Sequence, residues 1–238
     1  MDLSNLHPTR RSLVKGLLLA SSFAPALLSV LAQASANSQV PVVPGFQEIK
    51  GDVRLNGASA VVGQVVNPGD VVATGMDGSC VVIIGQHVYL IGEDSELEFY
   101  GEDFEEGLDG SVSGKITLNL GSLLAVFGKT NTTITTPLAT IGIRGTACYV
   151  NAKPDKTYAC VCYGRGELGG AEDGLPLESV QTSHHDSPRY IYPKGSTVRI
   201  EKAPVIDHTD SELRMLEALV NRRPPFDASR FQRNSDGY

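Results

Sequence analysis

Short apolar stretches separated by turn-forming residues cover most of the chain from residue 49 onward. Their alternation of apolar and polar positions and their many β-branched residues are typical of strands rather than helices. Because the strands follow one another closely, the pattern favours an all-β fold, a sandwich or β-roll of many short strands. The predicted strands are Ile49–Leu55, Ser59–Val66, Asp70–Thr74, Ser79–Ile84, His87–Ile91, Glu96–Phe99, Ile116–Leu120, Ser122–Phe127, Thr132–Thr135, Ala139–Ile143, Thr146–Asn151 and Thr157–Tyr163.

The last two strands of this series are expected to form a hairpin. Residues 153–156 read Lys-Pro-Asp-Lys, which suits a type I turn with proline at its second position. The hairpin would bring Cys148 close to opposite Cys160, give or take one residue of register. Cys160 and Cys162 share a face, because side chains alternate along a strand. Three thiols are therefore expected on one side of the hairpin.

One helix is predicted near the C-terminus, over about residues 210–222. Thr209 and Glu212 have the spacing of a capping box, and Pro224-Pro225 ends the pattern. We expect this helix to pack against the β domain or a partner. Its apolar stripe consists of Leu213, Leu216, Leu219 and Val220.

The N-terminus has the layout of an export signal. Arg10-Arg11 and Lys15 precede an apolar run over residues 16–32, and small-x-small cleavage sites end at Ala34 and Ala36. The paired arginines indicate the twin-arginine route. The alternative is a membrane anchor, but the run is interrupted by serine and proline and is shorter than the ~20 apolar residues that a span needs. We therefore expect a periplasmic protein with no membrane span after signal removal.

These features suggest five regions. They are an export signal at 1–36, a linker at 37–46, a β domain at 47–170, an extension at 171–225 that carries the helix, and a disordered tail at 226–238.

The charge balance is acidic, with a formal net charge of −7. Removal of residues 1–36 would leave 17 basic and 26 acidic side chains, a net of −9. Nonspecific binding to nucleic acid relies on basic surface. The charge therefore argues against a nucleic acid as the partner.

The stretch Thr135–Val150 contains a single arginine, Arg144, between Gly142 and Gly145. Its neighbours are apolar enough that we expect the guanidinium to be buried. A buried guanidinium needs a carboxylate or carbonyl partner, because removal of the partner costs roughly 3 to 5 kcal/mol. Arg144 is thus predicted to be a structural clamp or the centre of a ligand site.

Several short motifs along the chain resemble those of the FecR-like periplasmic domain family. They are Gly51-Asp52-Val53, residues 68–74 (Pro-Gly-Asp-Val-Val-Ala-Thr), Thr136-Pro137 and Gly145-Thr146, within about residues 47–170. The resemblance implies a periplasmic sensing or interaction domain. The best-known relatives pass an iron-siderophore transport signal to a sigma factor. This chain begins with an export signal in place of their cytoplasmic anti-sigma segment and membrane helix, so sigma-factor control is not implied.

Cysteine and histidine provide the second functional hypothesis, a periplasmic metal-binding protein. Thiolates and imidazoles suit Zn²⁺ or another soft or borderline metal, and Asp186 is placed to orient an imidazole. Buried core thiols, or a cross-strand disulfide between Cys148 and Cys160, are the alternatives. Cys80 is expected in the core. The candidate ligands are Cys148, Cys160, Cys162, His184 and His185.

Other chemistry has little support. The triplet Gly128-Lys129-Thr130 lacks the upstream glycine of a phosphate loop, because Leu123 stands there. The acidic residues of Gly101–Gly114 do not have EF-hand spacing and are expected to form a solvated loop. Neither a G-x-S-x-G nor an H-E-x-x-H motif is present. We expect a protein that is not an enzyme: an exported module for sensing or protein interaction, in envelope or iron-related signalling, or alternatively a metal-binding protein.

Overall fold

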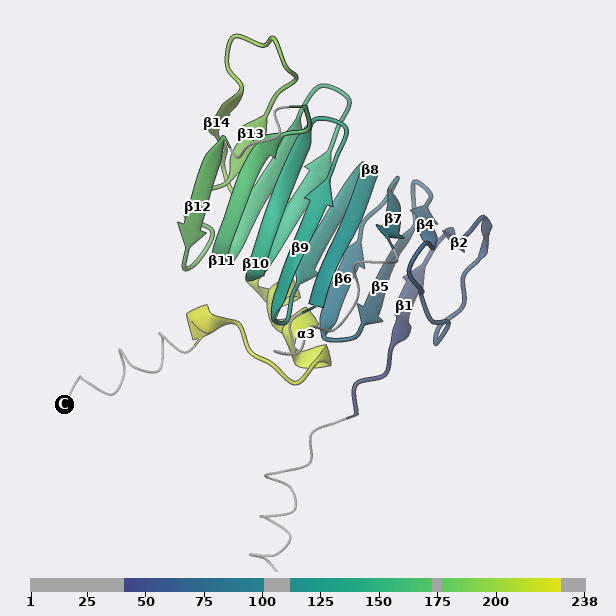
Figure 1. The fold of residues 1–238 in the computed structure, drawn as a ribbon. Helices are drawn as coiled ribbons and strands as arrows, with labels where there is room; N and C mark the ends of the chain where they lie inside the picture. The colour runs from purple at the N-terminus through teal and green to yellow at the C-terminus, as the bar shows by residue number, and fades with distance from the viewer. Residues whose placement is uncertain (1–40, 101–111, 173–176, 228–238) are drawn as a thin grey trace, which may run out of the picture. The chain divides into compact units, whose positions relative to one another are not determined.

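The computed structural model describes residues 41–100, 112–172 and 177–227. Within these ranges the chain is all-β, with fourteen strands and one longer helix near the C-terminus, so the predicted fold class is confirmed (Figure 1). The first seven strands are β1 (Gly45–Lys50), β2 (Val53–Leu55), β3 (Ala58–Ser59), β4 (Val71–Thr74), β5 (Ser79–Ile84), β6 (His87–Ile91) and β7 (Glu96–Tyr100). The remaining elements are β8 (Val112–Val126), β9 (Thr130–Thr135), β10 (Ala139–Ala152), β11 (Thr157–Gly170), β12 (Glu178–Thr182), β13 (Arg189–Ile191), β14 (Ile200–Lys202) and α3 (Asp210–Leu219).

The strands hydrogen-bond in the order β14-β13-β11-β10-β9-β8-β7-β4-β2-β3. Strands β5 and β6 branch from β8, β1 pairs with β5, and β12 pairs with β11. All pairings are antiparallel except β8 with β9. Strands β10 and β11 form the predicted hairpin, closed by Ala152 opposite Thr157.

The alternation of side chains divides the buried residues into two clusters on opposite faces of the same strands. Along β11, Ala159 and Val161 enter the main core, whereas Cys160 and Cys162 enter a second cluster. The main core is lined by side chains from both halves of the sheet, such as Phe46 and Ile141. The second cluster lies beneath the C-terminal helix, and it is the face on which the candidate site forms.

The helix α3 begins with the predicted capping box, in which Thr209 Oγ1 accepts a hydrogen bond from the Glu212 amide and the Glu212 side chain accepts one from the Thr209 amide. It packs against β6 and β8. Leu213 and Leu216 are fully buried in the second cluster. The apolar stripe read from the sequence is thus the face that docks on the sheet. None of the helices within the described ranges has the length and apolar character needed to cross a bilayer.

Two glycines explain where the predicted strand boundaries differ from those observed. Gly121 has φ 86°, and a Cβ there would come within 2.1 Å of Ser95 Oγ. This backbone conformation lets β8 bend without ending, so the predicted strands Ile116–Leu120 and Ser122–Phe127 form one strand. Gly51, at φ 58°, instead interrupts a strand, so the predicted strand Ile49–Leu55 is divided into β1 and β2.

The observed strands also differ from the predicted ones in two other parts of the chain. The range Ser59–Val66 is mostly loop, because only Ala58–Ser59 pairs with β2. Strands β12 to β14 were not predicted. Most of the acidic loop assigned to Gly101–Gly114 lies outside the described residues, although β8 already begins at Val112. The export signal, residues 37–40 of the predicted linker and residues 228–238 of the predicted tail also lie outside them.

Candidate metal centre

Four side chains capable of binding a metal converge on the face of the sheet that α3 covers. Cys160 and Cys162 come from β11, His185 from the loop between β12 and β13, and His208 from the turn before α3. Their ligand atoms all lie within 4.8 Å of one another. The two cysteines are fully buried, and the two histidines have only small exposed fractions, 9% for the side chain of His185 and 8% for His208. The group therefore forms an enclosed Cys₂His₂ set.

The two thiols lie together because β11 is a regular strand at this point. Cys160 pairs with Tyr149 of β10, and Cys162 follows two residues later on the same face. The Cys162 thiol lies 3.8 Å from the carbonyl of Cys160. The alternation of side chains along the strand is therefore enough to bring the two sulfur atoms to the same face.

His185 is positioned by a tight loop centred on Asp186. The Asp186 carboxylate accepts hydrogen bonds from the amide of Ser183 and the hydroxyl of Thr182, at 3.1 and 2.8 Å. The amide of His185 donates to the carbonyl of Cys162 at 2.9 Å, which holds the loop to β11. His185 has φ 51°, in the left-handed region that residues other than glycine seldom adopt. The loop keeps this conformation while it turns the imidazole toward the thiols.

His208 lies directly before the helix N-cap, Thr209. Its Nδ1 lies 2.7 Å from the carbonyl oxygen of Ile206, and its ring stacks on Tyr149 with centroids 4.7 Å apart and planes 13° from parallel. The preceding residue, Asp207, has φ 59°. These contacts fix both the plane of the imidazole and the direction of Nε2, which faces His185.

The hydrogen bonds of the two imidazoles determine where their protons lie. A carbonyl oxygen only accepts, so Nδ1 of His208 carries a proton and the neutral ring has its lone pair on Nε2. Likewise Nε2 of His185 donates to the Asp210 carboxylate at 3.3 Å, which leaves the lone pair on Nδ1. These two nitrogens are 3.0 Å apart. Two lone pairs at this distance repel unless a proton or a metal cation lies between them.

The spacing is close to that of a tetrahedral zinc site. With Zn–N of about 2.0–2.1 Å and Zn–S of about 2.3 Å, a tetrahedron has N–N edges of about 3.4 Å and N–S edges of about 3.6 Å. Cys160 Sγ lies 3.6 Å from His185 Nδ1, and the two nitrogens are 3.0 Å apart. These two separations are close to the tetrahedral values, and all four ligand atoms lie within 4.8 Å of one another.

The electrostatics of the group favour a cation. The pKa of Cys160 is lowered, chiefly by its interaction with the Cys162 side chain and, against the opposing effect of burial, by its interactions with the imidazoles of His185 and His208. Burial raises the pKa of Cys162 well above its usual value. Burial also acts to lower the pKa of His185, but hydrogen bonds to Cys160 and Asp210 outweigh it and the net shift is upward. The lowered pKa of Cys160 favours the thiolate form, which is the form that binds a metal cation.

A second group of possible ligands, His184, His185 and Asp210, shares one imidazole with the first. Asp210 Oδ1 lies 2.7 Å from His184 Nε2 and 3.3 Å from His185 Nε2. A neutral imidazole has only one lone pair, so His185 cannot bind a metal through both nitrogens without losing its second proton. Since His184 is 44% exposed and Asp210 29%, the better use of Asp210 is to orient His185 from behind. This is the carboxylate–histidine–metal arrangement common in zinc proteins.

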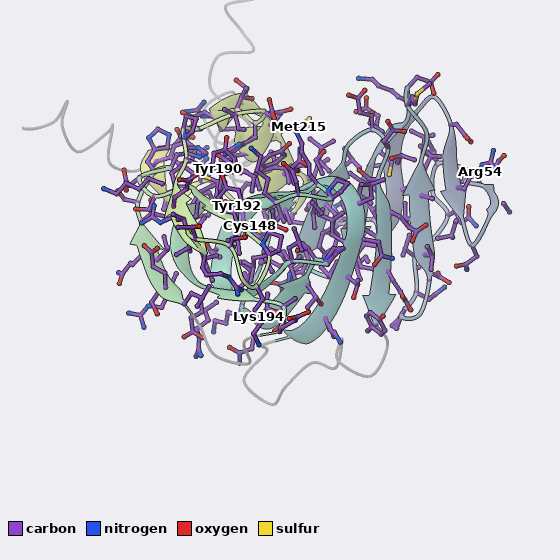
Figure 2. The ribbon with its side chains drawn as sticks, turned by 90° about the horizontal axis from the view of Figure 1, so that it is seen from above. Arg54, Cys148, Tyr190, Tyr192, Lys194 and Met215 are labelled. Carbon is purple, nitrogen blue, oxygen red and sulfur yellow. The ribbon has the colours of Figure 1, made fainter. Side chains whose placement is uncertain are left out.

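The structure brings together only part of the ligand set predicted from the sequence. Cys160, Cys162 and His185 meet, and His184 lies beside them, with its ring 4.9 Å from that of His185. Cys148 does not join them, because it pairs with Val161 and points into the main core on the other face. Cys148 is labelled in Figure 2, on the opposite side of the view from Arg54. Asp186, which we expected to orient an imidazole, holds its own loop instead, and Asp210 contacts the imidazole of His185.

All four cysteines are free thiols. Cys80 is buried in the main core, as predicted, and burial raises its pKa to about 12. The disulfide considered between Cys148 and Cys160 is absent, since the two side chains lie on opposite faces of the sheet.

Arg144 is exposed, so the expectation of a buried guanidinium was wrong. Its side chain is 59% exposed, and its Nη2 lies 3.5 Å from a carboxylate oxygen of Glu167, which is itself 38% exposed. At Arg144 the strand β10 turns this position outward, while Ile143 points into the core. The residue therefore forms a surface ion pair.

His208 is the ligand that sequence reasoning missed. It is separated from His185 by two strands and has no short-range motif with the cysteines. The available signal was its place immediately before a helix cap, where a side chain is held in a fixed direction.

Comparison with known proteins adds little to this geometry. No family model and no curated protein matches the chain, so the resemblance to the FecR-like family stays a prediction. Two crystal structures described as a putative anti-sigma factor from Parabacteroides distasonis, at 2.50 and 1.65 Å resolution, are similar to part of it at 9% identity. Their TM-scores are 0.44 and 0.45, over 56% and 62% of this chain and 59% and 64% of those chains. The chain thus covers less than two thirds of either, and we draw no conclusion from likeness this low.

Proposed function

We propose that the protein binds one Zn²⁺ ion through Cys160, Cys162, His185 and His208. The observation that carries this proposal is the pair of imidazole nitrogens, His185 Nδ1 and His208 Nε2, which face each other at 3.0 Å with their protons engaged elsewhere. A metal ion accepts both lone pairs at once and binds the thiolate beside them.

The donor set favours zinc over the hard cations. Two sulfur and two nitrogen ligands suit Zn²⁺ and other soft or borderline metals, whereas Mg²⁺ and Ca²⁺ prefer oxygen. Two thiolates and two neutral imidazoles also balance the charge of a divalent cation. This balance matters because the cysteines are fully buried and an uncompensated charge there would be costly.

Four protein ligands leave no open coordination position, which is the mark of a structural or regulatory zinc site rather than a catalytic one. The proposed role of the metal is therefore structural or regulatory.

The simplest competing account is a thiolate–imidazolium pair with no metal. The test is to purify the full chain under reducing conditions and measure zinc per chain. We expect about one zinc in the wild type, close to none in His208→Ala, and an unchanged content in His184→Ala. Loss of metal in His184→Ala with retention in His208→Ala would indicate that the metal is bound by the second group, His184, His185 and Asp210. Metal-free wild type that takes up no added zinc would contradict the proposal.

We also propose that the protein acts outside the cytoplasm as a sensing or protein-interaction module. The paired Arg10-Arg11 ahead of an apolar run supports export. The exposed valines of the loop between β3 and β4, Val61 at 62% and Val62 at 64%, support contact with a protein or envelope component. Fractionation of cells that carry Arg10→Lys together with Arg11→Lys tests the export route. Unchanged periplasmic yield in that variant would contradict twin-arginine export.

A further inference from the structure

We propose that the metal regulates the conformation of the turn before α3, so that metal occupancy latches residues 203–209 onto the sheet. The proposal rests on the zinc site above and adds what the bound metal does. Three separate parts of the chain supply the ligands, namely β11, the loop after β12 and the turn before α3. The last of these is mostly exposed apart from its ligand.

Residues 203–209, called here the latch segment, contain few buried side chains, although Ala203 and Ile206 are partly buried against the second cluster. His208 is its single buried residue, and its apolar Val205 is 47% exposed. Outside the metal site, the segment is tied to the sheet by the stack of His208 on Tyr149 and by the Tyr158 hydroxyl, which donates to the carbonyl of Pro204 at 3.0 Å. The amide of Ala203 donates to the carbonyl of Pro188 at 3.0 Å. Few buried apolar contacts and exposed backbone hydrogen bonds characterise segments that open locally.

The far end of α3 is held by a separate set of contacts. Leu213 and Leu216 are fully buried, and Glu217 accepts hydrogen bonds from Tyr163 of β11 and from Arg222. Arg222 also donates to the carbonyl of Gln86, at 2.7 Å. These contacts remain when the metal leaves. Loss of metal is therefore expected to free the latch segment while the rest of α3 stays docked.

Movement of the latch segment would alter a groove beside it. Tyr149 and Asp207 line a groove of about 730 Å³ that also includes residues from the turns before β5 and β7 and from β8. Tyr149 is the residue on which His208 stacks, and Asp207 belongs to the latch segment. Occupancy of the metal site thus sets the position of one wall of this groove. A change in metal availability would be converted into a change in the shape of an exposed surface.

Amide hydrogen exchange of the full chain tests the latch. If the segment opens only after the metal leaves, free zinc at about 100 times its Kd should slow exchange in residues 203–209 about 100-fold relative to the chelated protein. The Ala203 amide is the most direct probe, since its hydrogen bond to Pro188 joins the segment to the sheet. The Arg222 amide, which donates to the Glu217 carbonyl at 2.8 Å, is the internal reference and should not respond.

The outcomes separate the latch from the metal site. Failure of the wild type to bind zinc would overturn the site itself. Zinc binding with unchanged exchange in residues 203–209 would overturn only the latch. A comparable acceleration in β10 and β11 on chelation would also overturn it, because the metal would then hold the whole domain. The variant His208→Asn should exchange rapidly in residues 203–209 with or without zinc, and slow exchange there would contradict the latch.

Discussion

His208 Nε2 lies 3.0 Å from His185 Nδ1, although 23 residues and two strands separate the two histidines along the chain. Each ring has its other nitrogen committed, one to the Ile206 carbonyl and one to the Asp210 carboxylate. This relationship gives the buried cysteines of β11 two nitrogen partners. The predictions that follow depend on it or on the contacts around it.

The thiols of Cys160 and Cys162 should both be required for metal binding. Cys160→Ser and Cys162→Ser should each reduce bound zinc from about one per chain to near zero, because a neutral serine hydroxyl does not replace a thiolate on zinc. Zinc content and free-thiol titration under denaturing conditions measure this. Cys80→Ala is the matched control, since Cys80 lies in the main core and should leave the zinc content unchanged. Equal metal loss in the control would indicate a general folding defect.

Asp210 should raise metal affinity without touching the metal. Its carboxylate accepts from His185 Nε2, and loss of such an orienting partner typically weakens metal binding about 10- to 100-fold. Asp210→Asn should show this loss in a competitive chelator titration. Asp207→Asn, which changes a carboxylate of the latch segment that lines the groove instead, is the control. Equal zinc affinities for Asp210→Asn and Asp207→Asn would show that Asp210 does not orient His185.

Glu217 should be important for stability rather than metal binding. It is 4% exposed and forms a pair with Arg222, with Nε to Oε2 at 2.5 Å, while Tyr163 donates to its other oxygen. Removal of one partner of a buried ion pair costs about 3 to 5 kcal/mol. We expect Glu217→Ala to lower the free energy of unfolding by an amount in this range, measured with denaturant. A loss below about 1 kcal/mol would be the size seen for exposed pairs and would contradict burial of this network.

Arg144 should contribute little to stability. Both members of its ion pair with Glu167 are more than one third exposed, and exposed pairs contribute about 0 to 1 kcal/mol. Arg144→Ala should therefore change the free energy of unfolding by no more than about 1 kcal/mol. A larger loss in denaturant unfolding would restore the interpretation of Arg144 as a buried clamp.

The pair of Glu178 with Arg189 should make stability depend on pH in the acid range. Hydrogen bonds from Arg189 lower the pKa of Glu178 below its usual 4.5, with burial acting in the opposite direction. A carboxyl with a lowered folded pKa contributes stability that is complete above the unfolded pKa and is lost as the pH falls through the folded pKa. In chelated protein, the stability difference between the wild type and Glu178→Gln should shrink as the pH falls below about 4.5. A difference that stays constant would contradict this.

The fold class could be predicted because its signals are local. Alternation along β11 and the capping box at Thr209 each depend on a few neighbouring residues. The hairpin turn was located correctly, with Ala152 opposite Thr157. Strands β12 to β14 are short, and their apolar pattern is too brief to distinguish them from loop.

The site could be predicted only in part because its ligands meet through tertiary contacts. Pairing of Cys148 with Val161 rather than Cys160 is a shift of one residue, within the margin of the prediction, yet one residue moves a side chain to the other face of a sheet. Cys148 therefore does not belong to the observed group of metal ligands. His208 enters it through the docking of α3, which no sequence spacing encodes.

X-ray absorption at the zinc edge tests the central claim most directly. For the full chain purified with its metal, the Cys₂His₂ site predicts two sulfur ligands at about 2.3 Å and two nitrogen ligands at about 2.0–2.1 Å. The imidazole contribution should fall in His208→Ala. A first shell of oxygen and nitrogen without sulfur, or a chain that binds no zinc, would contradict the account.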